Sequence, residues 1–336
     1  MKAPVFNGVG KPLTIETMPD PVPEAGRLVL EIGRCGICGT DLHMTSGEGE
    51  TFPEGMVLGH EFAGEVVAKG ADTDGFNEGD IVAALPVTGC GNCASCKAGD
   101  PAVCSAGFIG SAGGYGQYAI AKATAAIRLP ASMSLEDGAL VEPMAVGLHG
   151  ATLAQLSPGA KVLVIGAGPI GIASTYWAKR LGAGKIVVAA RSRRGEPYAI
   201  EMGADTFALT DENLDAAVTE GLGGPPDVIF ECAGVPGVLA MAINIVRPRG
   251  TVIVLGNCMV PDTIFPAQAM FKQVRIQGSN IYSVGEFQVV ADSFDAGHVE
   301  PRSMISDTWN YDELPTRFEE LRSGSDQCKV MVNPWA

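Results

Sequence analysis

The N-terminal half of the chain alternates short apolar runs with turn-forming residues. Two such runs, Arg27–Ile32 and Gly64–Ala68, are rich in aliphatic residues, and the segments around them contain glycine, proline and aspartate. Runs of this length and composition are typical of β-strands. The pattern therefore predicts a β-rich region over roughly the first 150 residues.

A different pattern begins at Lys161, where apolar runs alternate with helix-like segments. This alternation predicts a parallel, doubly wound sheet in an α/β chain. The predicted strands are Lys161–Ile165, which is followed by a helix up to Leu181, and then Ile186–Ala190, Asp227–Phe230 and Thr251–Leu255. After Tyr282 the alternation ends, and Asp312–Arg322 has the pattern of an amphipathic helix before a last strand, Lys329–Val332.

Length and composition narrow the class of protein. A chain of 336 residues predicts about two domains, and 44 glycines with 22 prolines fit an α/β enzyme with many turns. A net charge of −15 repels phosphates, so neither nucleic acid nor a membrane surface is expected as a partner. The N-terminus does not resemble a signal peptide and no apolar run reaches the ~18 residues that span a bilayer, so a cytoplasmic location is expected.

Four cysteines lie close together at Cys90, Cys93, Cys96 and Cys104. Thiolates at this spacing can surround a tetrahedral zinc ion without straining the loop that carries them. The alternative is a pair of disulfides in a secreted protein, which the lack of a signal peptide disfavours. The spacing therefore predicts a structural zinc site.

A second set of potential ligands lies upstream. It consists of Cys38, within Cys35-Gly-Ile-Cys-Gly-Thr-Asp-Leu-His43, and of the pair His60-Glu61. The chain has only four histidines, and two of them fall within these motifs. Each residue taken alone has a structural alternative, as a core thiol or an ordinary hydrogen-bonded group. Together they indicate a second metal site.

The first strand of the alternating region leads directly into a glycine-rich turn. This turn, Gly166-Ala-Gly168-Pro169-Ile170-Gly171, comes immediately before the predicted helix. In this context the glycines permit a tight turn, close approach of a pyrophosphate and close packing of helix on strand. The motif predicts a dinucleotide site, and the alternative is a glycine-rich turn without a ligand.

The end of the second strand indicates which dinucleotide binds. An NAD-binding chain usually has Asp or Glu about 20 residues beyond the glycines, whereas this chain has Ala190 followed by Arg191, Ser192, Arg193 and Arg194. Arginine can bind a 2′-phosphate bidentately, and a carboxylate would repel it. We therefore expect Arg191, Ser192 and Arg194 to select NADP(H); the alternative is a solvated basic turn.

In the order of these motifs the chain resembles the zinc-dependent medium-chain dehydrogenases/reductases, the superfamily of alcohol, sorbitol and threonine dehydrogenases. The matching segments are Gly36–Asp41, Gly59–Glu61, the cysteine lobe, Glu142-Pro143 and Gly166–Gly171. The resemblance implies a GroES-like β-barrel catalytic domain over 1–149 and 283–336, with the zinc lobe at 88–106. It also implies a Rossmann domain over 150–282.

The resemblance also implies roles for individual residues. Cys38, His60 and Glu142 would bind a catalytic zinc, with Glu61 beside the ion as an exchangeable ligand, so that two zinc ions per chain are expected. Thr40 and His43 would pass the proton from the alcohol to solvent. Asp41 would orient a ligating side chain, or it would only cap a strand end.

Residues outside these sites have plainer interpretations. Cys35 fits no ligand position of the family, and we expect it, with Cys232, Cys258 and Cys328, to be a buried thiol. We expect His149 to pack near the junction of the domains.

The expected activity is interconversion of a secondary or cyclic alcohol and its ketone by hydride transfer. Met44 and Ile281 stand where sorbitol-type members tend to have Tyr and Arg, so a less hydroxylated substrate is favoured. The alternative is a polyol or sugar dehydrogenase, and less expected are a primary alcohol substrate, a non-enzymatic nucleotide-binding protein and a zinc-free enoyl reductase. The family further implies a homodimer or homotetramer formed through the sheet edge near Arg275–Ser279.

Overall fold

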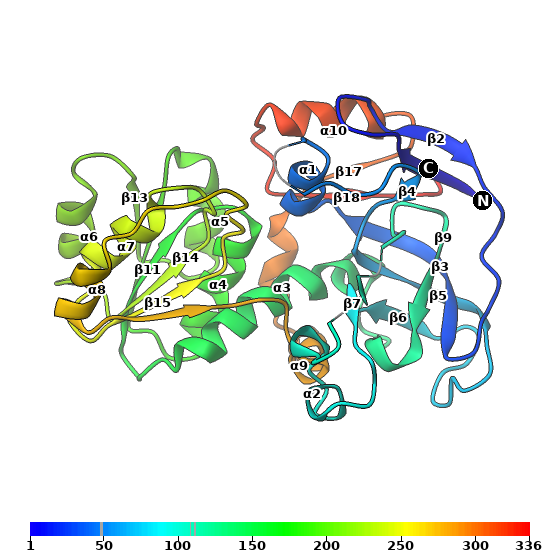
Figure 1. The fold of residues 1–336 in the computed structure, drawn as a ribbon, viewed down its shortest axis with the longest axis horizontal. Coiled ribbons are helices and arrows are strands. Elements are labelled where there is room, and N and C mark those ends of the chain that lie inside the picture. Colours follow the sequence, from blue (N-terminus) through cyan, green and yellow to red (C-terminus); the bar gives the residue numbers. More distant parts are fainter. Residues whose placement is uncertain (48–49, 108, 111) are drawn as a thin grey trace. The chain divides into compact units, whose positions relative to one another are not determined.

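The computed structural model describes residues 1–47, 50–107, 109–110 and 112–336 (Figure 1). The chain divides into two compact units. Unit 1 comprises Met1–Glu142 and Tyr282–Ala336, and unit 2 comprises Pro143–Ile281. The sequence pattern predicts boundaries at 149/150 and 282/283, whereas the units divide at 142/143 and 281/282. The first division lies within one continuous helix, α3 (Leu135–Ala154), and Pro143 is inside this helix and does not end it.

The main sheet of unit 1 is built around the long strand β3. Its strand order is β10-β6-β5-β3-β18-β17, with β9 also paired to β3. The strands are β3 (Arg27–Gly36), β5 (Glu61–Lys69), β6 (Ile81–Ala84), β9 (Tyr118–Lys122), β10 (Ala126–Arg128), β17 (Ile305–Trp309) and β18 (Lys329–Val332). Leu28, Leu30 and Ile32 alternate along β3 and point into the core of this unit, as a period of two requires.

Shorter elements complete unit 1. One small sheet joins β1 (Lys2–Phe6), β2 (Thr14–Thr17) and β4 (Met56–Val57), and another joins β7 (Val87–Thr88) and β8 (Ile109–Gly110). The helices are α1 (Gly39–Met44), α2 (Ala94–Lys97), α9 (Val284–Asp295) and α10 (Leu314–Arg322), with 3₁₀ turns η1 (Pro101–Val103), η2 (Ala123–Ala125) and η4 (Glu300–Met304).

Strand β18 brings the end of the chain into this sheet. It lies between β3, to which it is antiparallel, and β17, to which it is parallel. All four of its residues are buried. Figure 1 accordingly shows the red C-terminal elements in the same unit as the blue N-terminal ones.

Unit 2, every residue of which is described, is a parallel sheet of six strands in the order β13-β12-β11-β14-β15-β16. The strands are β11 (Lys161–Ile165), β12 (Lys185–Ala190), β13 (Thr206–Leu209), β14 (Val228–Glu231), β15 (Thr251–Val254) and β16 (Arg275–Gly278). The helices are α4 (Pro169–Arg180), α5 (Glu196–Glu201), α6 (Leu214–Leu222), α7 (Val238–Ile245) and α8 (Pro266–Lys272), with the turn η3 (Arg193–Gly195). The doubly wound sheet expected from the alternating pattern is confirmed.

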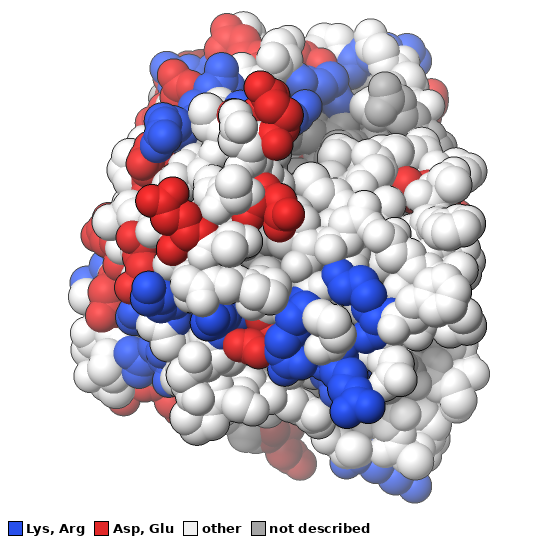
Figure 2. Space-filling view, turned by 90° about the vertical axis from the view of Figure 1, so that its left-hand side faces the viewer, with Lys and Arg blue, Asp and Glu red and all other residues white. Residues whose placement is uncertain are grey.

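Basic side chains of unit 2 satisfy the carboxyl ends of helices. Lys272 donates to the carbonyls of Ile243 and Asn244 at the end of α7, and Lys161 donates to that of Gly223 after α6. Cations at this end of a helix are favourable because the last carbonyls carry partial negative charge. Figure 2 shows one group of Lys and Arg side chains in the lower half of the face drawn and others near its upper edge, although the chain as a whole has a net charge of −15.

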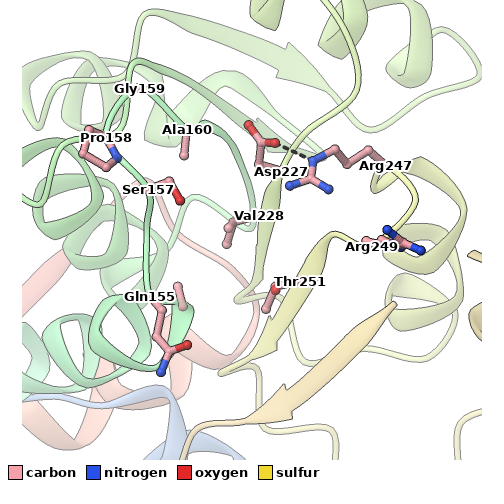
Figure 3. Close-up of a pocket in the computed structure, with 11 residues that line it drawn as sticks. Gln155, Ser157, Pro158, Gly159, Ala160, Asp227, Val228, Arg247, Arg249 and Thr251 are labelled. Atoms are coloured by element: carbon pink, nitrogen blue, oxygen red, sulfur yellow. Dashed lines mark hydrogen bonds and ion pairs between the residues drawn. The ribbon is translucent and has the colours of Figure 1, made fainter. Parts of the chain in front are cut away.

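A polar cavity of about 220 Å³ lies at the amino edge of the same sheet (Figure 3). Gln155 lines one side, and Thr251 and Arg247 line the other. The guanidinium of Arg247 forms an ion pair with Asp227, with Nε 2.5 Å from Oδ1. Ligands of doubly wound sheets bind at the carboxyl edge, so we do not assign this cavity to the dinucleotide.

Candidate active site

The four cysteines of the lobe converge on one point. Their sulfur atoms all lie within 4.8 Å of one another. All nine cysteines of the chain are described and are unpaired thiols, so the alternative of two disulfides has no support here. Four clustered thiols are the donor set of a closed, tetrahedral zinc site.

Backbone N–H groups hold the sulfur atoms of the lobe. Cys93 caps α2, and its sulfur accepts from the N–H of Cys96. The sulfur of Cys90 accepts from the N–H groups of Asn92 and Cys93, and that of Cys104 accepts from the N–H of Cys90. The N–H of Cys96 is the main reason why the pKa of Cys93 falls to about 5, since a donor favours the thiolate.

The second group of ligands forms where β3 meets β5. One ligand atom each from Cys38, His60 and Glu61 lies within a 4.8 Å group. The pairing of Gly36 with Glu61 in the antiparallel register brings the segment that follows β3 beside the start of β5. Two motifs that are 22 positions apart in the sequence thus meet at one site, as the sequence predicts.

Asp41 connects two of these residues. Its Oδ2 accepts from the N–H of Cys38 at 3.1 Å, which completes a capping box at the start of α1. Its Oδ1 lies 3.4 Å from Nδ1 of His60. Burial opposes ionisation of Asp41, but the charge of His60 and hydrogen bonds, including one from Tyr115, hold its pKa below the usual value. The carboxylate therefore both caps a helix and faces a predicted ligand.

Glu142 lies outside the group formed by Cys38, His60 and Glu61. It is carried by α3, and its Oε1 accepts a hydrogen bond of 2.9 Å from the hydroxyl of Tyr282. Burial, together with the charge of Glu61, raises the pKa of Glu142 to about 7. Coordination of a catalytic zinc by Glu142 therefore stays a prediction.

Lys329 is a neighbour that the sequence motifs did not indicate. Its Nζ lies 2.7 Å from both carboxylate oxygens of Glu61 and donates to the carbonyl of Ile37 at 3.0 Å. Both side chains of the ion pair are only 1% exposed. Burial alone would lower the pKa of Lys329, but the carboxylate of Glu61 raises it. Glu61 is therefore engaged by an ammonium group, and its role as an exchangeable ligand stays a prediction.

The two residues expected to carry the proton lie on the short helix α1. Thr40 is half-buried and His43 is exposed. They are three positions apart, so they lie on the same side of the helix. About one turn of α1 thus separates Thr40, two residues after Cys38, from the exposed His43.

The glycine-rich turn of unit 2 has the geometry that its sequence predicts. Gly166 follows β11 with φ of +110°, a conformation that favours glycine. A Cβ at Gly171 would collide with the carbonyl of Gly166. Gly168 caps α4, Pro169 is its first residue and Ile170 its second. The start of α4 lies at the carboxyl edge of the sheet, where helix N–H groups can bind a pyrophosphate.

The basic segment expected to select the coenzyme follows β12. Arg191, Ser192 and Arg194 are exposed. Arg193 is also exposed, but its Nη1 lies 2.8 Å from both carboxylate oxygens of Glu196. The ion pair neutralises Arg193, the arginine that we did not assign to the coenzyme.

Comparison with known proteins agrees with this geometry. The alcohol dehydrogenase GroES-like domain family matches residues 24–131, and the zinc-binding dehydrogenase family matches residues 169–296. A sorbitol dehydrogenase of Bacillus subtilis (strain 168) is 31% identical over 99% of this chain and 97% of its own length. The chain belongs to the zinc-dependent alcohol dehydrogenase family.

Solved structures of this zinc-dependent family have the same fold. The crystal structure of 2R,3R-butanediol dehydrogenase from Bacillus subtilis has a TM-score of 0.87 at 29% identity, with 99% of each chain covered. A putative zinc-binding dehydrogenase from Sinorhizobium meliloti 1021, solved bound to NADP, has a TM-score of 0.86 at 30% identity and the same coverage. The chain is therefore an oxidoreductase with a GroES-like domain and a Rossmann domain.

The donor sets fit the zinc ions of this family. A thiol, an imidazole and a carboxylate are ligands of catalytic zinc, and four thiols are ligands of structural zinc. Within the part of the chain that the structure describes, Oδ1 of Asp41 is a buried acceptor without a hydrogen-bond partner, although Nδ1 of His60 faces it. A histidine that binds metal commonly donates its other N–H to such a carboxylate.

Three cysteines differ from the expectation. Cys35 is fully buried as expected, whereas Cys232, Cys258 and Cys328 are half-buried. Cys232 directly follows β14 and Cys328 directly precedes β18, whereas Cys258 lies in the loop beyond the end of β15. His149 is half-buried within α3. Over the described ranges the structure contains no helix long and apolar enough to cross a bilayer.

Proposed function

We propose that the protein is a zinc-dependent, NADP(H)-preferring oxidoreductase that interconverts a secondary or cyclic alcohol and its ketone. The observation that carries the proposal is the group formed by Cys38, His60 and Glu61, with Asp41 held against His60. Zinc bound there would supply a Lewis acid that polarises the substrate oxygen. We assign this metal to Cys38 and His60, and we assign Glu142 as its carboxylate ligand. A second zinc would be held by Cys90, Cys93, Cys96 and Cys104.

The residues of the chain itself supply the remaining functions. Burial excludes water from Glu61 and Glu142, which keeps the local dielectric constant low and strengthens electrostatic effects on a reacting group. We assign proton transfer towards solvent to Thr40 and His43, which lie on α1, the helix capped by Cys38. These roles agree with the activity of the family.

Two substrate classes compete. The side chains of Met44 and Ile281 cannot hydrogen-bond to additional hydroxyl groups, which favours a substrate with fewer hydroxyl groups than sorbitol, as the diol in the name of the butanediol dehydrogenase has. The similarity to a sorbitol dehydrogenase favours a polyol or sugar instead. A panel of secondary, cyclic and polyhydroxylated alcohols, assayed with elemental analysis of the same preparation, distinguishes them. Zinc well below two ions per chain in active protein would contradict the proposal.

NADP(H) preference is supported by the exposed Arg191 and Arg194 and by the absence of a carboxylate at Ala190. Each lost charge-assisted bond to a 2′-phosphate costs about 1.5–3 kcal/mol, or roughly 10- to 150-fold in affinity. Arg191→Ala should therefore raise KM for NADPH by about that factor and leave KM for NADH nearly unchanged. Arg193→Ala is the matched control, because Arg193 is already paired with Glu196. Equal or better efficiency of the wild-type enzyme with NADH would refute the preference.

We also propose a homo-oligomer that forms through β16. All four residues of this edge strand are exposed, and β15 is its only partner within the fully described unit 2. Phe271, on the neighbouring helix α8, is 80% exposed. Unpaired sheet edges and exposed apolar residues are commonly covered by association. Light scattering that finds a monomer at micromolar concentration would exclude this assembly.

A further inference from the structure

Tyr115 is a buried side chain to which neither the motifs nor the family comparison assigns a role. It is 0% exposed and is one of the largest fully buried side chains. Its hydroxyl donates to Oδ2 of Asp41 at 2.6 Å. Its backbone is fixed as well, because its N–H donates to the carbonyl of Leu58 at 3.0 Å and its carbonyl accepts from the hydroxyl of Tyr311 at 2.6 Å.

The ring of Tyr115 also packs against the residue that precedes His60. Gly59 has φ of +88°, and a Cβ at this position would collide with the ring. The ring thus lies against the backbone that carries His60, while the hydroxyl is bonded to the carboxylate that faces the same histidine. Tyr115 thus contacts both the segment that carries the histidine and the aspartate that faces it.

We propose that Tyr115 is a positioning residue for the metal site, acting through Asp41 on His60. The inference rests on the proposed function, because it assumes that His60 binds zinc. Asp41 has one oxygen bonded to Tyr115 and Cys38, and this arrangement aims the other oxygen at Nδ1 of His60. A proton held on Nδ1 leaves Nε2 as the lone-pair donor to the metal.

The hydroxyl matters because Asp41 is a buried carboxylate with few donors. The N–H of Cys38 donates to Oδ2 of Asp41 and opposes rotation of the carboxylate away from His60. The hydroxyl of Tyr115 donates to the same oxygen and adds a second restraint, with a hydrogen bond to a charged acceptor, which is stronger than a neutral one. Removal of the hydroxyl should weaken metal binding without removing any ligand.

The experiment measures zinc retention by the intact zinc-loaded protein against a competing chelator. The amount of zinc that wild type retains and Cys38→Ser loses measures binding at Cys38 and His60. The zinc that both proteins retain is assigned to the four-cysteine lobe. Loss of an outer hydrogen-bond partner of a ligating histidine typically weakens metal binding by about 10- to 100-fold. We expect Tyr115→Phe, which retains the ring packing on Gly59, to weaken zinc binding at this site by about 10-fold and to leave the lobe unchanged.

Tyr118→Phe is the matched control, since it also removes a tyrosine hydroxyl bonded to a carboxylate of the same unit, that of Glu31 at 3.4 Å, and not to Asp41. We expect its zinc affinity to stay within about 2-fold of wild type. Tyr115 and Asp41 are predicted to act as one unit. Tyr115→Phe should therefore have no additional effect on zinc affinity in an Asp41→Asn background. Unchanged zinc affinity in Tyr115→Phe, or an equal loss in Tyr118→Phe, would overturn the positioning role.

A measurement on the unaltered protein covers the case in which Tyr115→Phe does not fold. Nitrogen NMR of histidine-labelled, zinc-loaded protein should show His60 protonated on Nδ1, and protonation on Nε2 would overturn the inference. If wild type and Cys38→Ser contain the same amount of zinc, the proposed function fails as well. If they differ while Tyr115→Phe behaves as wild type, only the role of Tyr115 fails.

Discussion

The two cysteine sites of unit 1 are built in opposite ways. In the lobe, the sulfur atoms lie within fifteen consecutive residues and are held by backbone N–H groups of the same stretch. At the second site, Cys38 and His60 are surrounded by buried side chains from distant parts of the chain, including Tyr115 and Lys329. The first site is a local cluster of thiols, whereas the second is formed by the packing of the hydrophobic core. The ligands of the lobe should therefore determine folding, and those of the core site should determine chemistry.

The largest expected effect is a crossover between two serine substitutions. Cys38→Ser should lower kcat/KM by about 10³-fold or more, because loss of several kcal/mol of transition-state stabilisation costs tenfold per 1.4 kcal/mol. Its thermal unfolding should stay close to that of wild type. Cys93→Ser should instead lower the unfolding temperature or cause aggregation, because few apolar contacts hold the lobe together. Turnover and calorimetry on both variants test this crossover, and full activity in Cys38→Ser would contradict the contrast.

The next effect concerns the ion pair between Lys329 and Glu61. Removal of one partner from a buried pair leaves an uncompensated charge and typically costs 3–5 kcal/mol. We expect Lys329→Met to lose roughly that amount of unfolding free energy in chemical denaturation. Addition of Glu61→Gln should restore much of it, because the second change removes the orphaned charge. A stability within 1 kcal/mol of wild type for Lys329→Met would show that solvent reaches this pair.

The smallest effect is a difference in thiol reactivity within the lobe. The pKa of Cys93 is lowered to about 5. At Cys96 a backbone hydrogen bond from Gly91 lowers the pKa, but partial burial and hydrogen bonds with the other thiols outweigh it and raise the pKa to about 11. At pH 6, Cys93 is therefore a thiolate and Cys96 a thiol, so an alkylating reagent should modify Cys93 first in metal-free protein. As the pH falls below about 5, Cys93 becomes protonated and its advantage should disappear. Peptide mass spectrometry after brief alkylation measures the order, and preferential modification of Cys96 would contradict it.

The same contrast explains what the sequence could predict. The lobe was identifiable because its ligands are neighbours in the chain, and Cys38 and His60 were identifiable because each lies within a short motif. Tyr115 and Lys329 were not, since they are 74 and 268 positions from their partners Asp41 and Glu61. Spacing carries no information about contacts formed by folding a sheet. The one available signal was a lysine within the apolar strand Lys329–Val332, because a buried lysine requires a partner.

The fold was predictable to the same degree. The strands of unit 2 could be located because a buried parallel strand is a continuous apolar run bounded by turns. The division near Glu142 could not be located, because α3 continues through it: Pro143 lies at the division, but the helix extends beyond it to Ala154. Half-burial of Cys232, Cys258 and Cys328 was missed for a related reason. A position at the end of a strand does not determine how much of the side chain the neighbouring loops cover.

The insertion of β18 into the sheet of unit 1 has a consequence for synthesis on the ribosome. Unit 2 is contiguous and is complete once residue 281 has emerged, whereas unit 1 lacks β17 and β18 until the last fifty or so residues follow. Domains generally fold in the order in which they are translated. Here the region translated earlier must wait for β17 and β18, so the end of β3 at Cys35 and Gly36 lacks its partner strand during that interval, although β5 and β9 can already pair with the rest of β3. Nascent chains stalled before residue 305 should therefore expose a sheet edge for a chaperone to bind, and release of the C-terminal strand should close it.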